Sequence, residues 1–274
     1  MKVFISIDLE GISGISSEPQ TEPGTAEYRR DTELMRGDLD AALDGCWAAG
    51  AGEVVVCDAH DLGGNLTFRE LPPAASLVSG SPSPLSMMQG IDETFDVAMF
   101  VGYHAMAGTT GAVIDHTYTG SVFKVRIDDA LEVGEVGINA GVAGAFGVPV
   151  VFVSGDDKLA AEAVELIPGI ETAVVKEGQS RTCARLLSPE TAHQRIREGV
   201  ERALRKDPRP KPLDFSGSPL RLTFQATRYC DQAVLCPGVR RVDARAVEIT
   251  GKTYVDVFRT FLACLDLASP AHAG

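Results

Sequence analysis

Short, almost continuously apolar runs alternate with helix-like stretches along this chain. The strand-like runs are KVFISID (2–8), EVVVCD (53–58), FDVAMFVGYH (95–104), VPVVFVSGDD (148–157) and ETAVVK (171–176). Helical patterns fill residues 25–49 and 137–147, and Asp156 can cap a further helix that runs to Leu166. Apolar strands joined by helices are typical of parallel sheets buried on both faces. We therefore predict an α/β fold with a largely parallel sheet covered by helices on both faces.

Two regions differ from this pattern. Residues 121–136 read as a hairpin that turns at Asp128–Ala130, and LVSG (77–80) can form a short extra strand. After residue 180 the chain carries a charged amphipathic helix capped by Ser188, a Pro-rich loop, two further strand-like runs and a final helix over Tyr254–Leu267. We predict a metal-site domain over residues 1–180 and a smaller α/β unit over 181–274 packed on it.

Charge limits the partners of this 274-residue chain. A formal net charge of −13 argues against nucleic acid or an anionic membrane surface as a partner. The N-terminus has no apolar segment of signal-peptide length, and no apolar run reaches the ~20 residues of a membrane-spanning helix. We expect a cytoplasmic protein without membrane contact.

The six cysteines form no C-x-x-C pair. Cys46, Cys57 and Cys264 sit in apolar stretches, which favours buried free thiols in a reducing compartment. Cys230 and Cys236 are close enough in sequence that a bond between them remains open.

Residues that bind divalent metals stand at or just beyond the ends of the strand-like segments. They are Asp8, Glu10, His60, His104 and Glu135, the last on the return arm of the predicted hairpin. Any one of them alone is better explained as a turn or loop residue. Ligands gather at the carboxyl ends of parallel strands, so all five together predict one site. Three carboxylates and two imidazoles suit a pair of zinc ions.

Charge balance supports two ions. Two Zn²⁺ and a bridging hydroxide offset the three carboxylates, and a neutral centre tolerates burial far better than one with excess charge. One carboxylate must bridge the ions to hold them at the ~3.5–4 Å typical of such pairs. Asp8 is the candidate for this bridge because the end of the first strand is the most rigid position.

Several motifs carry a family resemblance over essentially the whole chain. They are S-x-D-x-E-G-x-x-G (6–14), D-x-H (58–60), G-Y-H-A (102–105), the D-H pair (115–116) and V-G-E-x-G-x-N-A (133–140). The chain resembles the zinc-dependent D-aminopeptidases linked to bacterial dipeptide-transport operons. The resemblance implies that Asp8 bridges both ions, that Glu10 and His60 complete one site, and that His104 and Glu135 complete the other. It also implies a ring-shaped homodecamer whose active sites face an internal chamber.

His116 is the candidate catalytic residue. On the resemblance, we expect a histidine that binds no metal and instead polarises the scissile carbonyl or protonates the leaving amine. The alternative is a surface histidine paired with Asp115. Asp115 replaces a residue that is usually small and polar in the family, and we expect it to raise the pKa of His116.

Three other residues have less specific roles. Asp58 can orient His60 as a hydrogen-bond acceptor or cap a turn. Asn139 is better explained as a helix cap than as a substrate-binding residue, and capping is also the better explanation for Asp156.

The predicted function is the release of N-terminal residues from short peptides by metal-bound hydroxide. D-amino acid peptides such as D-Ala-D-Ala follow from the resemblance alone. An amidase or lactamase with the same metals is the nearest alternative, and a two-metal phosphoesterase is a further one. No Arg or Lys stands next to the ligands to clamp a phosphate. A zinc-binding peptide carrier without turnover is the alternative that we rank last.

Overall fold

The computed structural model describes residues 1–269, whose strands form two sheets. The larger sheet has seven strands, and all neighbouring pairs are parallel except the last, where β9 runs antiparallel to β8. In their order across the sheet, the strands are β3 (Ala75–Val78), β2 (Glu53–Asp58), β1 (Lys2–Ile7), β4 (Val97–Val101), β7 (Val150–Asp156), β8 (Glu171–Ser180) and β9 (Cys183–Leu186).

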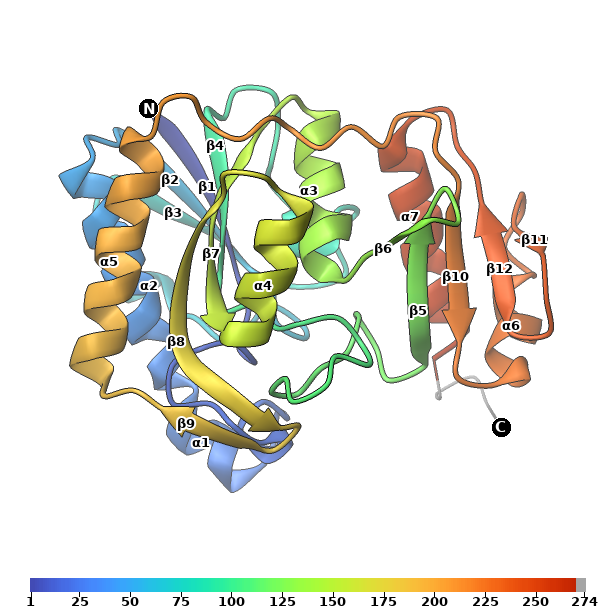
Figure 1. Cartoon of the computed structure of the whole chain (residues 1–274), viewed down its shortest axis with the longest axis horizontal. Helices are drawn as coiled ribbons and strands as arrows, with labels where there is room; N and C mark the ends of the chain where they lie inside the picture. The colour runs from blue at the N-terminus through green and yellow to red at the C-terminus, as the bar shows by residue number, and fades with distance from the viewer. Residues whose placement is uncertain (270–274) are drawn as a thin grey trace.

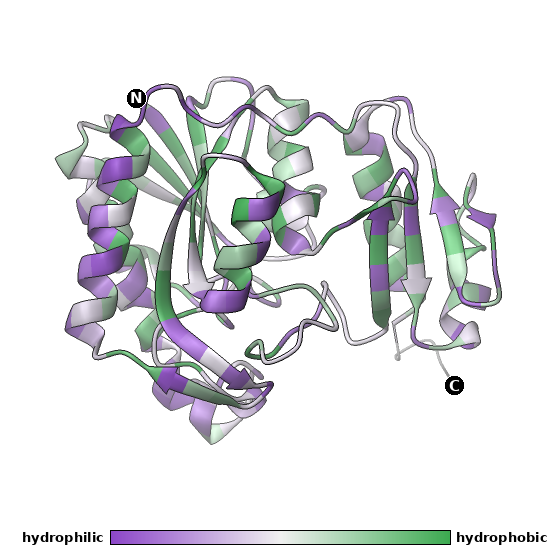
Figure 2. Cartoon of the chain, in the orientation of Figure 1, coloured by the Kyte–Doolittle hydropathy of each residue, from purple (hydrophilic) through white to green (hydrophobic). Residues whose placement is uncertain are grey.

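Helices cover both faces of this sheet (Figure 1). Val3 and Ile5 of β1 belong to the core with α2 and α5, whereas Phe4 points to the opposite face and joins the core with α3 and α4. Figure 2 shows the inner strands largely hydrophobic and α5 largely hydrophilic. The prediction of a parallel sheet buried on both faces is confirmed. The helices are α1 (Ala26–Asp31), α2 (Glu33–Ala48), α3 (Glu135–Ala145), α4 (Asp157–Leu166), α5 (Pro189–Arg205), α6 (Thr227–Ala233) and α7 (Tyr254–Leu267).

The second sheet is antiparallel and lies beside α7 (Figure 1). The hairpin prediction is confirmed, because Asp128 and Asp129 turn the chain with positive φ between β5 and a short β6. Along this sheet the strands are β11 (Arg240–Arg241), β12 (Ala246–Ile249), β10 (Leu220–Phe224), β5 (Val122–Ile127) and β6 (Leu131–Glu132).

The sheets divide the chain at points other than residue 180. After that residue, β9 still pairs with β8 and α5 returns to pack on α2. The hairpin of β5 and β6 lies before residue 180 in sequence, but it belongs to the second sheet, where β5 pairs with β10. The sequence becomes more charged after residue 180 because α5 has a charged outer face. Each of the two predicted units, 1–180 and 181–274, therefore contributes strands to both sheets.

Several boundaries differ from the sequence prediction. The helix expected over 25–49 is broken at Thr32 into α1 and α2. Asp156 caps α4 as predicted, accepting from the N–H groups of Lys158 and Leu159. In residues 1–269, no helix is long and apolar enough to span a membrane. The six cysteines are free thiols, so Cys230 and Cys236 do not pair.

Candidate metal centre

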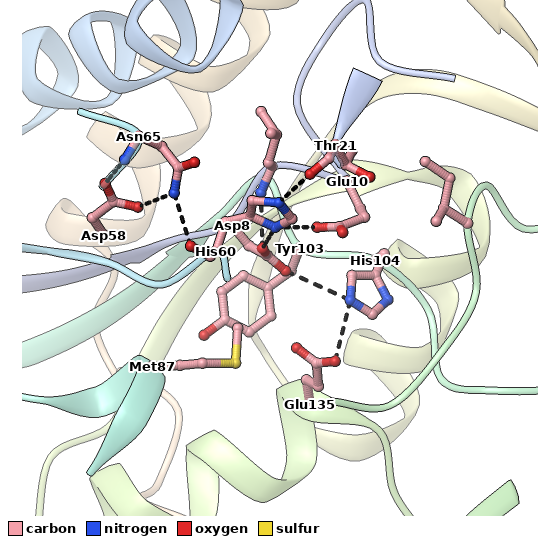
Figure 3. Close-up of polar contacts among 12 residues, drawn as sticks. Asp8, Glu10, Thr21, Asp58, His60, Asn65, Met87, Tyr103, His104 and Glu135 are labelled. Carbon is pink, nitrogen blue, oxygen red and sulfur yellow. Dashed lines mark hydrogen bonds and ion pairs between the residues drawn. The ribbon is translucent and has the colours of Figure 1, made fainter. Parts of the chain in front are cut away.

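Asp8, His60 and His104 lie at the carboxyl edge of the parallel sheet. They follow β1, β2 and β4, and β1 pairs with both of the other strands. Because parallel neighbours end at the same edge, residues far apart in sequence meet there. Figure 3 shows these side chains converging, with Glu10 and Glu135 on either side of Asp8. All five predicted ligands are buried and lie together.

Asp8, Glu10 and His60 form the first half of the site, which we call the Glu10 side. His60 Nδ1 lies 3.2 Å from Asp8 Oδ1 and 3.1 Å from Glu10 Oε2. Two carboxylates thus share one imidazole nitrogen.

His104, Glu135 and His116 form the second half, which we call the Glu135 side. His104 Nε2 lies 3.2 Å from Glu135 Oε1 and 3.5 Å from Asp8 Oδ2. His116 Nε2 lies 3.8 Å from Glu135 Oε1, and the rings of His104 and His116 stack at 4.0 Å. One oxygen of Asp8 therefore faces each half, as a bridging carboxylate requires.

Glu135 reaches the site from a helix, not from the hairpin arm that the sequence suggested. The strand β6 ends at Glu132, and Glu135 is the first residue of α3. The helix α3 begins two residues earlier than predicted, and its first residue is this buried carboxylate. The backbone N–H of Tyr118 donates to Glu135 Oε1 at 2.6 Å and fixes its orientation.

Each imidazole is oriented by a backbone carbonyl on the side away from the carboxylates. A metal-ligating histidine usually donates its outer N–H in this way, which leaves the inner nitrogen for the cation. These contacts are His60 Nε2 to the oxygen of Thr21 at 2.7 Å, His104 Nδ1 to that of Ala105 at 3.1 Å, and His116 Nδ1 to that of Ile114 at 2.8 Å.

The donor set fits divalent metal ions. Glu10 Oε2 and His104 Nε2 are buried and lack a partner with hydrogen-bond geometry; their close contacts are other candidate ligand atoms of the site. Ligand atoms of Asp8, Glu10 and His104 lie within 4.8 Å of one another, and so do those of His104, His116 and Glu135. Carboxylates and imidazoles without a thiolate are a ligand set that suits zinc in hydrolases.

Burial and neighbouring charges shift the pKa values of the three carboxylates of the site. Burial, reinforced by Glu10, raises the pKa of Asp8 to about 7. Burial also opposes the charge of Glu10, but the imidazole of His60 holds the pKa of Glu10 well below its usual range. In the same way His104 overrides the burial of Glu135 and lowers its pKa.

The pKa values of the two predicted histidine ligands are both raised. Burial disfavours the charged ring of His60, but Glu10 and Asp8 outweigh it and raise its pKa to about 12. Glu135 and Asp8 likewise outweigh the burial of His104 and raise its pKa to about 10. At neutral pH, the metal-free site therefore holds protons on both rings, and a metal ion must displace them.

His116 behaves differently, and the predicted effect of Asp115 is wrong. Burial and the nearby ring of His104 lower the pKa of His116. The carboxylate of Asp115 accepts from Arg181 Nη1 at 2.8 Å and from the N–H of Gly108 at 2.7 Å. Asp115 is therefore paired with Arg181, and the carboxylate that faces His116 is that of Glu135.

The role of Asp58 as a partner of His60 is also wrong. Its carboxylate accepts from the N–H and the side-chain amide of Asn65 and from the N–H of Leu66, as Figure 3 shows for Asn65. The alternative of a turn cap is confirmed, and Thr21 is the true partner of His60.

Asn139 is not a helix cap. It lies one turn into α3, fully buried, and donates to the hydroxyl of Tyr103 at 3.0 Å. Its side-chain oxygen accepts from the hydroxyl of Tyr118 at 2.7 Å. This contact steadies the segment that carries His116, a role that the sequence pattern alone did not reveal.

A cleft of about 560 Å³ opens onto the two halves of the site. Asp61 and Asp266 are among its lining residues, and no lysine or arginine of residues 1–269 lines it. Its apolar walls come from Leu62, Met87, Leu262 and Leu265.

Comparison with known proteins identifies the family. A model of the D-aminopeptidase family matches residues 1–263. The chain belongs to the D-aminopeptidase family. It is 37% identical over 270 residues to a D-aminopeptidase of Bacillus subtilis (strain 168), covering 98% of each chain. The chain is therefore a peptidase, and the resemblance inferred from its motifs is confirmed.

A solved structure supports the same assignment. The zinc-dependent D-aminopeptidase DppA from Bacillus subtilis, described as a self-compartmentalizing protease, superposes with a TM-score of 0.95 at 36% identity. The match covers 98% of both chains. The fold, including its second antiparallel sheet, is that of this family.

Proposed function

We propose that this chain is a binuclear zinc aminopeptidase that removes N-terminal residues from short peptides, with D-amino acid peptides such as D-Ala-D-Ala as substrates. The observation that carries the proposal is the position of Asp8. Its two oxygens face separate groups of inward-turned imidazoles and carboxylates.

In this proposal Asp8, Glu10 and His60 hold one ion, and Asp8, His104 and Glu135 hold the other. When bound, a pair of zinc ions polarises the scissile carbonyl and activates water for attack. The protein contributes rigid ligands, because each carboxylate and ring is already buried and oriented.

His116 handles the proton. Its Nδ1 donates to the carbonyl of Ile114, so the neutral ring presents an unprotonated Nε2 beside the carboxylate of Glu135. The lowered pKa favours this neutral form. We assign to Nε2 the acceptance of a proton from the attacking water and its return to the leaving amine.

The cleft favours a substrate with a positive terminus. Asp61 and Asp266 line it, and an α-ammonium group can pair with either. Among the described lining residues no lysine or arginine would assist the metal ions in clamping a phosphate, and Asp61 and Asp266 would repel it, which favours a peptide over a phosphate ester.

Substrate assays test the assignment. Purified protein loaded with zinc should hydrolyse D-Ala-D-Ala faster than L-Ala-L-Ala, simple amides, lactams or an aryl phosphate. Faster turnover of a simple amide or lactam would make it an amidase, and a preference for the aryl phosphate would refute the peptidase proposal.

We also propose a cytoplasmic ring-shaped homodecamer. Its six free thiols suit a reducing compartment, and the solved relative is described as self-compartmentalizing. Large apolar side chains such as Phe68, 73% exposed, are available for contacts between subunits. Light scattering should give ten times the chain mass of 29.0 kDa, and a monomer would refute the ring.

A further inference from the structure

Lys176 is a buried cation on a strand that contributes no residue to the metal centre. It follows Val174 and Val175 in β8, and its exposed fraction is 0%. Its ammonium group donates to the backbone oxygens of Glu10 at 2.5 Å, Ile12 at 2.9 Å and Ile15 at 2.7 Å. The three N–H bonds of the ammonium therefore all end on one loop, the loop that carries Glu10.

The buried carboxylate of Asp38 holds the same loop at Ser13. Asp38 of α2 is also 0% exposed and accepts from the N–H of Ser13 at 2.8 Å and from its hydroxyl at 2.6 Å. The loop thus meets a cation at its carbonyls and an anion at its donors. Hydrogen bonds to charged groups are stronger than neutral ones, so the loop is held more firmly than backbone contacts alone would achieve.

Close packing removes the remaining freedom of the loop beside Glu10. The N–H of Gly11 donates to the oxygen of Gly102 at 2.7 Å. A Cβ at Gly11 would lie 1.8 Å from the backbone oxygen of Tyr103, so no side chain fits there. The backbone of Glu10 therefore has Lys176 on one side and the end of β4 on the other.

We propose that Lys176 is a positioning residue that holds the Glu10 loop and thereby sets the metal affinity of the Glu10 side. It touches no reacting atom. Burying an ammonium group is costly, and its three bonds to this loop give a reason for its presence. The proposal rests on the proposed metal centre, and it predicts an effect confined to one half of that centre.

The test is a zinc titration of variants against a competing chromophoric chelator. Lys176→Met removes the charge and the donors, and Lys176→Gln keeps a polar donor in case the first variant fails to fold. Lys206→Met is the matched control, because Lys206 pairs with Glu171 at the opposite end of β8. Both Lys176 variants should bind one ion about 10- to 100-fold more weakly, as loss of supporting contacts does in other metal sites. The control should match the wild type.

Half-site backgrounds distinguish positioning from general damage. In Glu135→Ala, where the Glu10 side remains, Lys176→Gln should weaken the bound zinc. In Glu10→Ala, where the Glu135 side remains, the same substitution should change little. Equal weakening in both backgrounds, or unchanged affinity for both ions, would overturn the role of Lys176. A wild type that binds no zinc would instead refute the metal centre itself.

Discussion

The two halves of the proposed metal centre are built in different ways. The Glu10 side takes its ligands from the ends of two paired parallel strands and the loop after β1. The Glu135 side draws on the start of α3 and on irregular loops after β4. The first is specified by sheet topology and the second by packing and loop contacts.

The two halves also differ in their imidazoles and in the pKa values of those rings. Each half gathers two carboxylates on one imidazole nitrogen, but on the Glu135 side a second imidazole, that of His116, stacks on His104. Glu10 and Asp8 raise the pKa of His60 to about 12, whereas the more deeply buried His104 reaches about 10. We infer that the Glu10 side mainly retains metal, and that the Glu135 side also handles protons through His116.

Removing one carboxylate from either half should have the largest effect of the single-half variants. Glu10→Ala and Glu135→Ala should each lose about one zinc per chain and about 10³-fold or more in kcat/KM, because the proposed mechanism uses both ions. Zinc content and D-Ala-D-Ala kinetics check this. Asp61→Ala, also in the cleft wall, is the control for metal content. Loss of both ions in either variant would mean that the halves are not separable.

His116 separates proton transfer from metal binding. His116→Ala should lower kcat by about 10²- to 10⁴-fold, the range for a positioned acid–base group, and leave two zinc ions in place. Elemental mass spectrometry and steady-state kinetics measure the two effects. If the variant retains only one zinc, His116 is a ligand on the Glu135 side.

Metal affinity should rise with pH because binding releases protons. His60 and His104, with pKa values of about 12 and 10, stay protonated in the metal-free protein through neutral pH, so each half releases a ring proton. Below about pH 7 the Asp8 carboxyl is protonated as well, so the first ion to bind should release a second proton and its affinity should depend more steeply on pH. Zinc titrations from pH 5.5 to 8.5 test this. A slope that does not change near pH 7 would contradict the shared role of Asp8.

The smallest expected effect concerns Asp115. Asp115→Ser removes a partly exposed contact with Arg181, worth about 1 kcal/mol or less, and leaves His116 beside Glu135. kcat/KM and its pH profile should stay within about threefold of the wild type. A clear shift of the profile would show that Asp115 acts on His116 after all.

The features that depend on strand order were predictable from the sequence. Apolar strands imply a parallel sheet, and metal-binding residues at their ends imply one site, so Asp8, His60 and His104 could be placed before the structure was known. The start of α3 at Glu135 was missed because small residues allow a strand, a loop or a helix equally well. The interlaced sheets were missed because β5 and β10 pair across almost a hundred residues, and local patterns carry no record of that pairing.

The residues that hold the candidate ligands in place were harder to predict. Thr21 accepts from His60, and Lys176 donates to Glu10, in both cases at a backbone carbonyl. Every residue has such a carbonyl, so the type of the accepting residue does not predict the contact. A lysine ending the apolar run ETAVVK was the one available hint. Asp58 and Asp115 are acidic residues close in sequence to His60 and His116, but in the structure Asp58 accepts from Asn65 and Asp115 accepts from Arg181.

The most direct test of the account is the zinc content of Asp8→Ala beside the wild type, on protein purified without chelator. Asp8 faces both halves, so the wild type should carry about two zinc ions per chain and the variant close to none. Circular dichroism confirms that the variant is folded. A folded variant that keeps one tightly bound zinc, or a wild type that binds only one, would contradict a centre joined through Asp8.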